Sequence, residues 1–194
     1  MDELKFIRER IEASVKLKSS LLSNDAILSS VNKLVEEILN CYKNGGKVLW
    51  AGNGGSAADA QHLAAELSGR FYYDRAPLFS EALHVNTSYL TAVANDYSYD
   101  LVYSRLTQAM GKKGDILIGL STSGNSGNVI NALIKAKETG MITAGFTGES
   151  GGKMKPHCDL LINIPSTDTP RIQECHMLLG HTVCEMVEMK MFPK

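Results

Sequence analysis

The chain has 194 residues, of which 44% are hydrophobic and 21% charged, and its formal net charge is −1. These values are those of an ordinary soluble globule of one domain, and they exclude the strongly basic surface of a nucleic-acid-binding protein. The N-terminus has no signal-peptide core, and no stretch approaches the ~20 apolar residues of a membrane span. The four cysteines form no C-x-x-C pair. We therefore expect a cytoplasmic protein with reduced thiols and with neither a membrane nor a nucleic-acid partner.

Two amphipathic helices are predicted in residues 1–44, one over residues 2–22 and one from Asn24 or Asp25 to Gly45. Apolar residues recur at helical spacing in both helices. A minimal βα repeat does not need this helical pair, so it must cover something else. A subunit interface is one reading, and a cap over the edge of the sheet is nearly as good.

The first strand, turn and helix follow. A short apolar run over residues 47–51 predicts a buried strand, three glycines at 52, 54 and 55 predict a turn, and an alanine-rich segment predicts a helix ending at Gly69. A glycine turn before a helix N-terminus favours an anion, and Ser56 can cap that helix or contact the ligand. The same residues fit G-x-G-x-x-A, so a dinucleotide-binding enzyme is an alternative. It is disfavoured because residues 70–80 form a poor strand.

His62 and Glu66 stand four residues apart, about one helical turn beyond these glycines, and therefore share one face. A sugar phosphate held at the turn could reach both side chains. The competing interpretation is a solvated helix face.

The rest of the chain alternates strands with helices. Strands are predicted over 82–85, 115–120, 141–146 and 159–164, and helices over 87–96, 99–110, 127–139 and about 170–190. This order predicts an α/β fold, a doubly wound parallel sheet flanked by helices, with an α/β core over residues 47–194. Ligands of such sheets bind beyond the carboxyl ends of the strands.

The loop after the strand at 115–120 is the sharper ligand signal. Four hydroxyls at Ser121, Thr122, Ser123 and Ser126 precede a helix, and together with its free N–H groups they suit a phosphate. No lysine is present, so this is not a Walker A loop. A turn that is rich in serine only to cap the helix is the weaker alternative.

The final helix carries several polar side chains. His181 and Glu185 are four apart, so Glu185 could orient the imidazole or form a surface ion pair. His176 projects away from His181 on a helical wheel and is interpreted as structural.

Taken together, these motifs resemble those of the phosphoheptose isomerases, which belong to the sugar isomerase (SIS) superfamily. The resemblance covers essentially the whole chain, so a single SIS domain over residues 1–194 is implied. The matching segments are Gly52–Ser56, His62–Glu66, Asn95–Asp96, Ser121–Ser126 and Arg171–Glu174 with His181. The resemblance implies conversion of sedoheptulose 7-phosphate to D-glycero-D-manno-heptose 7-phosphate. This is the first step toward a nucleotide-activated heptose, ADP-heptose or GDP-heptose, for lipopolysaccharide core, capsule or surface-layer sugars.

Residue roles are implied by the same resemblance. Glu66 would be the base and His181 its acid/base partner. The phosphate and sugar would contact Asn53, Gly54, Gly55, Ser56, Glu66, Asn95, Asp96, Ser121, Thr122, Ser123, Ser126 and Gln173. One zinc ion per subunit would be held by His62, Glu66, Gln173 and His181, although two helical residues eight apart, Gln173 and His181, lie ~12 Å apart along the axis. The family is homotetrameric, with sites near subunit contacts.

A different class remains open. Some SIS proteins are not enzymes: one relative of these isomerases binds the replication initiator DnaA, and others sense sugar phosphates. The presence of both Glu66 and His181 favours the enzyme.

Overall fold

The computed structural model describes residues 1–194. Five parallel strands form one sheet in the order β2-β1-β3-β4-β5. They are β1 (Val48–Gly52), β2 (Ser80–Ala82), β3 (Ile116–Ser121), β4 (Ile142–Thr147) and β5 (Leu160–Asn163). The predicted α/β fold with a doubly wound parallel sheet is confirmed. The order reverses between β1 and β3, which are direct neighbours, so the topological switch point lies between them.

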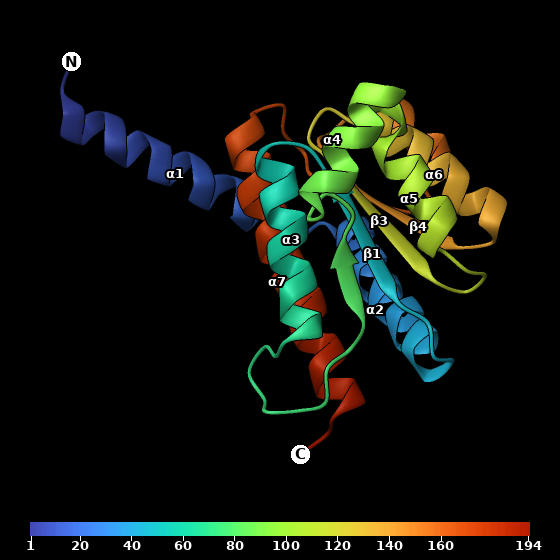
Figure 1. The fold of residues 1–194 in the computed structure, drawn as a ribbon. Helices are drawn as coiled ribbons and strands as arrows, with labels where there is room; N and C mark the ends of the chain where they lie inside the picture. Colours follow the sequence, from blue (N-terminus) through green and yellow to red (C-terminus); the bar gives the residue numbers. More distant parts are fainter.

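Helices cover both faces of this sheet (Figure 1). Alternate strand residues belong to two separate apolar cores: Trp50 and Ile118 to the core packed under α2, α3 and α7, and Leu49 and Leu117 to the core under α5 and α6. The strands therefore read as continuous apolar runs, as expected of parallel strands that are buried on both faces. The helices are α1 (Glu3–Leu21), α2 (Asp25–Lys43), α3 (Gly55–Ser68), α4 (Thr87–Asp96), α5 (Val102–Met110), α6 (Gly127–Thr139) and α7 (Thr169–Met191), with short 3-10 helices η1 (Tyr99–Leu101) and η2 (Gly152–His157).

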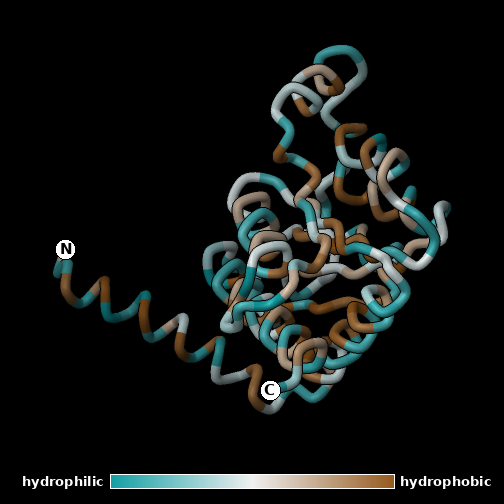
Figure 2. Tube along the Cα trace, turned by 60° about the horizontal axis from the view of Figure 1, so that its bottom comes forward, coloured by the Kyte–Doolittle hydropathy of each residue, from teal (hydrophilic) through white to brown (hydrophobic).

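The first helix, α1, projects from the rest of the molecule (Figure 1). From Arg10 onward it contacts α7, where the Ser14 hydroxyl donates to Glu174 (2.6 Å) and Arg171 donates to the Arg10 carbonyl (2.8 Å). Its apolar residues recur along the exposed part of the helix (Figure 2). Leu4, Ile7, Ile11 and Val15 keep 52–65% of their surface exposed.

One predicted strand is misplaced. The apolar run over residues 82–85 predicts a strand there, but β2 ends at Ala82, and a turn follows at Leu83 and His84. Ser80 belongs to the strand because it pairs with Val48 in register and because its hydroxyl accepts a buried bond from the Trp50 indole (2.8 Å). A short edge strand takes its position from such partners rather than from its own hydropathy.

None of the helices combines the length and apolar character that a bilayer crossing requires. All four cysteines are free thiols.

Candidate active site

The two predicted ligand loops lie side by side at the switch point. β1 and β3 pair in register, with Gly52 opposite Leu120, so the loops that begin at Asn53 and Thr122 leave the same edge of the sheet. Three helices begin at this edge, α3, α6 and α7, and none has a side chain that caps its N-terminus. Among the other α-helices, α1, α2 and α4 are capped by the side chains of Asp2, Asn24 and Asn86, and α5 has no side-chain cap. The free N–H groups and helix dipoles at this edge suit an anion.

The serine loop is pre-shaped by its own hydroxyls. Ser126 is the N-cap residue of α6, yet its hydroxyl turns away from the helix to Ser121, 2.9 Å distant, and Ser123 lies 3.5 Å from Ser121. Gly124 sits at a φ of +66°, and a Cβ there would stand 2.3 Å from the Gly151 carbonyl oxygen. Only glycine fits that backbone approach. Three hydroxyls are thus gathered at one helix N-terminus.

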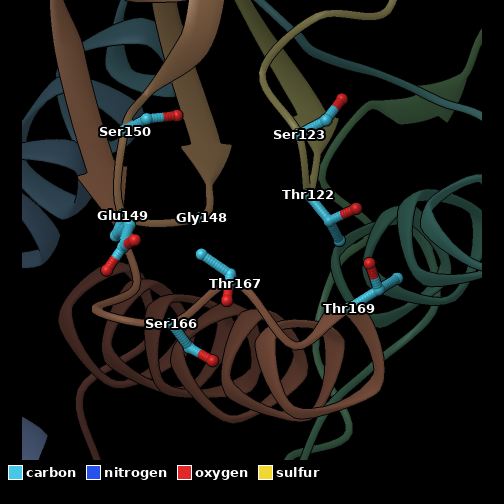
Figure 3. A pocket seen from close by; sticks show the side chains of 8 residues that line it. All are labelled: Thr122, Ser123, Gly148, Glu149, Ser150, Ser166, Thr167 and Thr169. Carbon is cyan, nitrogen blue, oxygen red and sulfur yellow. The ribbon is translucent and has the colours of Figure 1, made fainter.

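A cavity of about 180 Å³ opens beside this loop, and no hydrophobic residue lines it. In Figure 3, Thr122 and Thr169 lie close together on one side of the cavity, with Glu149 on the opposite side. The Gly148 N–H donates to the Thr122 carbonyl (2.9 Å) and joins the loops after β3 and β4. The lining residues are Thr122, Ser123, Gly148, Glu149, Ser150, Ser166, Thr167 and Thr169.

The glycine loop differs in part from expectation. Gly54, at a φ of +56°, is the N-cap residue of α3, so Ser56 does not cap the helix but lies buried inside its first turn. Gly55 is required by its neighbour, because a Cβ there would come within 2.5 Å of the Gln173 amide. The side chain of Asn53 turns to Asn128 and to the Tyr99 hydroxyl (3.0 Å).

Helices α3 and α7, which are far apart in the sequence, bring His62, Glu66 and His181 together. His62 Nε2 lies 3.0 Å from Glu66 Oε1 and 2.9 Å from His181 Nε2. One ligand atom of each residue lies within 4.8 Å of the others. His62 is half exposed, whereas Glu66 and His181 are partly buried. The predicted convergence of Glu66 on α3 with His181 on α7 is therefore found.

The electrostatics of this cluster suit a bound cation. Burial is the largest influence that lowers the pKa of His181, and the adjacent His62 lowers it further, while Glu66 opposes them. A neutral imidazole offers a lone pair. Two imidazole nitrogens and a carboxylate oxygen that face one point form a donor set that zinc accepts. No hydrogen bond joins Glu185 to His181, so the orienting role suggested by their spacing is not seen.

Other predicted residues lie around this centre. Gln173 is within α7 rather than at a non-helical start, and its amide packs on Gly55. Asn95 and Asp96 are exposed at the end of α4, where the Asn95 amide donates to the Asp96 carboxylate (2.9 Å). His176 is fully buried and 3.1 Å from the Thr147 carbonyl oxygen, which agrees with a structural role.

Sequence reasoning missed two groups of residues here. The polar segment Ser166–Thr169 directly follows β5, and the rule that strand ends meet at one edge would have included it. Phe71, whose ring centre lies 5.7 Å from that of His181, comes from the irregular segment after α3 and had no local signal.

Comparison with known proteins identifies the family and the fold. Residues 14–148 match the SIS domain family. The chain is 49% identical over 187 residues to the phosphoheptose isomerase of Aneurinibacillus thermoaerophilus, covering 96% of this chain and 94% of that protein. It is also 49% identical over 192 residues to that of Burkholderia pseudomallei, with 99% and 98% coverage.

Solved structures agree with these relatives. Phosphoheptose isomerase GmhA from Neisseria gonorrhoeae superposes with a TM-score of 0.89 at 40% identity, over 95% of this chain and 98% of that chain. A phosphoheptose isomerase from Francisella tularensis gives 0.92 at 32% identity, over 96% and 98%.

Proposed function

We infer the reaction of this chain from one premise: it belongs to the phosphoheptose isomerase family of SIS-domain proteins. It is an isomerase of a heptose phosphate, and we propose sedoheptulose 7-phosphate and D-glycero-D-manno-heptose 7-phosphate as its substrate and product. The observation that carries this is the convergence of Glu66 on α3 with His181 on α7. A protein that only binds a sugar phosphate has no need of an acid/base pair at this place.

The chemistry requires one proton to move between adjacent carbons. Glu66 removes a proton from C1 of the ketose, and the C1–C2 enediol forms as the C2 oxygen gains a proton. The same proton, or one from solvent, returns to C2, while the C1 oxygen loses its proton to give the aldose. His181 exchanges the protons of the two oxygens. A carboxylate and a near-neutral imidazole are suited to these two tasks.

The phosphate is assigned to the serine loop. Ser121, Ser123 and Ser126 already point to one another, and Thr122 lines the adjacent cavity. Gly54, Gly55, Ser56, Gln173, Asn95 and Asp96 are proposed to contact the sugar. Asn53 contributes through its main chain in this scheme, since its side chain already binds Asn128. Glu149 stands at the far side of the cavity, where a carboxylate can accept sugar hydroxyls but would repel a phosphate (Figure 3).

We also propose one zinc ion per subunit, held by His62, Glu66 and His181, with Gln173 as a further ligand. The donor set supports this proposal, because two imidazole nitrogens and one carboxylate oxygen lie within 4.8 Å of one another, and each can offer a lone pair to a metal ion. When bound, the ion would act as a Lewis acid on the substrate carbonyl. Gln173 is the weakest member, because it lies eight residues before His181 on one continuous helix.

The assembly is proposed to be a homotetramer in the cytoplasm. The exposed apolar residues of α1 have no partner within one chain, and burying them against other copies would stabilise an oligomer by about 1.5–3 kcal/mol per fully covered side chain. Four free thiols suit a reducing compartment.

Direct conversion is the test of the activity. The protein is incubated with sedoheptulose 7-phosphate, with and without added Zn²⁺, and the anomeric proton of the aldose is followed by NMR. A parallel reaction in D₂O should place deuterium on the reacting carbon, as a solvent-exchanging base requires. Absence of aldose under both metal conditions would contradict the proposal and favour a sugar-phosphate-binding protein.

A further inference from the structure

A buried ion pair lies behind the acid/base cluster, between the segment after α3 and the end of α7. Arg75 and Glu188 expose only 2% and 1% of their side chains, and Arg75 Nε lies 3.0 Å from Glu188 Oε1. Glu188 also accepts the backbone N–H groups of Phe71 (2.8 Å), Tyr72 (2.6 Å) and Tyr73 (3.0 Å). Burial alone would raise the pKa of Glu188, but these three N–H groups and Arg75 hold it below its usual value.

The other nitrogens of Arg75 reach the last turn of α3. They donate to the carbonyl oxygens of Glu66 (2.8 Å), Leu67 (2.8 Å) and Gly69 (3.1 Å). Carbonyls in the last turn of a helix have no intrahelical partner, and a cation there also complements the helix dipole. Arg75 therefore binds the backbone of the residue that is proposed as the base.

Glu188 connects the ion pair to the helix that carries the His181 imidazole. It stands seven residues, about two turns, beyond His181 and so lies on the same face of α7. The segment that it holds carries Phe71, which packs against the His181 ring. The pair thus joins the main chain of Glu66, the wall beside His181 and the helix of His181.

We propose that Arg75 and Glu188 are positioning residues that set the distance between the Glu66 carboxylate and the His181 imidazole. This rests on the roles proposed for Glu66 and His181. A buried ion pair adds little net stability over an apolar pair of similar volume, so its use here is geometric: it fixes two helices and a loop at one point. A glutamine at position 188 would turn its own N–H donor toward the backbone N–H groups of residues 71–73. This repulsion would shift residues 71–73 and, with them, the side chains around His181.

The test compares Glu188→Gln and the milder Arg75→Lys with the wild type. For sedoheptulose 7-phosphate, kcat should fall about 10- to 100-fold in Glu188→Gln, because a small misplacement of reacting groups is costly, while KM changes little. Arg75→Lys keeps the charge but not the forked set of N–H donors, so its kcat should lie between those of the wild type and Glu188→Gln. Hydrogen exchange of amides in residues 67–73 should accelerate in both variants, and exchange in β3 should not. Zn²⁺ affinity, measured by competition with a chromogenic chelator, should weaken.

Glu36→Gln is the matched control, since Glu36 pairs with Lys190 at the same end of α7 but on the exposed surface. It should keep the wild-type kcat. Variants that are folded by circular dichroism, with wild-type kcat and wild-type exchange in residues 67–73, would overturn the proposal, and so would equal losses in the Glu36 control. If the wild type itself does not convert the heptose phosphate, the proposed function fails, and the exchange and Zn²⁺ measurements decide the positioning role alone.

Discussion

Asn53 and Asn128 bind each other through both ends of their side-chain amides. The Asn53 Nδ2 donates to Asn128 Oδ1 (2.8 Å), and the Asn128 Nδ2 donates to Asn53 Oδ1 (3.0 Å). Asn53 belongs to the glycine loop, and Asn128 is a buried residue in the first turn of α6, just after the serine loop. This pair is therefore a direct link between the two loops that are proposed to hold the sugar and its phosphate.

Asn128→Ala should loosen that link. The partly buried Nδ2 group of Asn53 would lose its acceptor, at a cost of about 1 kcal/mol in stability, and the side-chain bonds that hold the two loops together would be lost. We expect KM for the sugar phosphate to rise about tenfold, which corresponds to ~1.4 kcal/mol, with a smaller change in kcat. Asn131→Ala on the same helix, which removes an exposed bond to the Asp100 carbonyl, should leave KM unchanged. Equal KM values in the two variants would contradict the link.

Glu66→Gln should nearly abolish turnover while ligand binding survives. General-base catalysis contributes about 10²- to 10⁴-fold, and the amide keeps the size of the carboxylate without its basicity. Steady-state kinetics gives the loss in kcat, and calorimetry with the sugar phosphate gives the retained affinity. Glu185→Gln, which alters the carboxylate four residues beyond His181, is the control and should turn over normally. Normal turnover by Glu66→Gln would rule out its role as the base.

Removal of metal should inactivate the enzyme reversibly. Metal analysis of the purified protein should find zinc, treatment with chelator should abolish activity, and Zn²⁺ should restore it. His62→Ala should lose zinc together with activity, because His62 touches both Glu66 and His181. Gln173→Ala should lose less zinc, because Gln173 lies eight residues before His181 on α7. Full activity in a rigorously metal-free sample would remove zinc from the reaction.

Stability should fall on acidification because of His176. Burial lowers the pKa of this histidine to about 4, although a bond to the Thr147 carbonyl opposes the shift. The unfolded chain binds a proton near pH 6.5 and the folded chain only near pH 4. The stabilisation is therefore complete above pH 6.5 and is lost as the pH falls toward 4, by about 3 kcal/mol in all.

Urea unfolding between pH 7 and pH 4.5 measures this loss in the wild type and in His176→Gln. The variant should show a flatter dependence of the unfolding free energy on pH, whatever its stability at pH 7. His157→Gln, on a partly exposed histidine, should keep the wild-type slope. Identical slopes in the wild type and His176→Gln would show that this histidine does not titrate as its burial predicts.

Ile11→Asp should dissociate the assembly if α1 is an interface. Ile11 is in the middle of the exposed apolar residues, and a buried unpaired carboxylate there would be strongly unfavourable. Light scattering should give a smaller mass for the variant than for the wild type, which we propose to be a tetramer, at the same concentration. Lys16→Asp introduces a carboxylate on the opposite side of the helix and should leave the mass unchanged. A tetrameric Ile11→Asp protein would place the interface elsewhere.

The sequence predicted most of this fold because the relevant signals are local. Apolar runs, helix-capping residues and glycines at helix ends depend on neighbours within a few positions, and they located every strand except β2, whose place depends on Trp50 and Val48 of another strand. The convergence of Glu66 and His181 came from a family resemblance, since nothing in their own spacing of more than a hundred residues indicates it.

Contacts between residues far apart in the chain could not be predicted from the sequence. The bond between Arg75 and Glu188 joins positions 113 apart, and that between Asn53 and Asn128 joins positions 75 apart. The segment after α3 looks irregular because its order comes from one distant carboxylate rather than from a periodic pattern. The three-dimensional arrangement was needed to see that this segment belongs to the site.

The close approach of Gly124 to Gly151 also limits how such a protein can be altered. Any side chain at 124 would collide with the Gly151 main chain, so the serine loop and the turn after β4 must change together or not at all. Efforts to make the enzyme accept shorter or longer sugars should therefore leave this turn fixed and vary the exposed residues Thr167 and Thr169, whose side chains can be exchanged without moving a backbone.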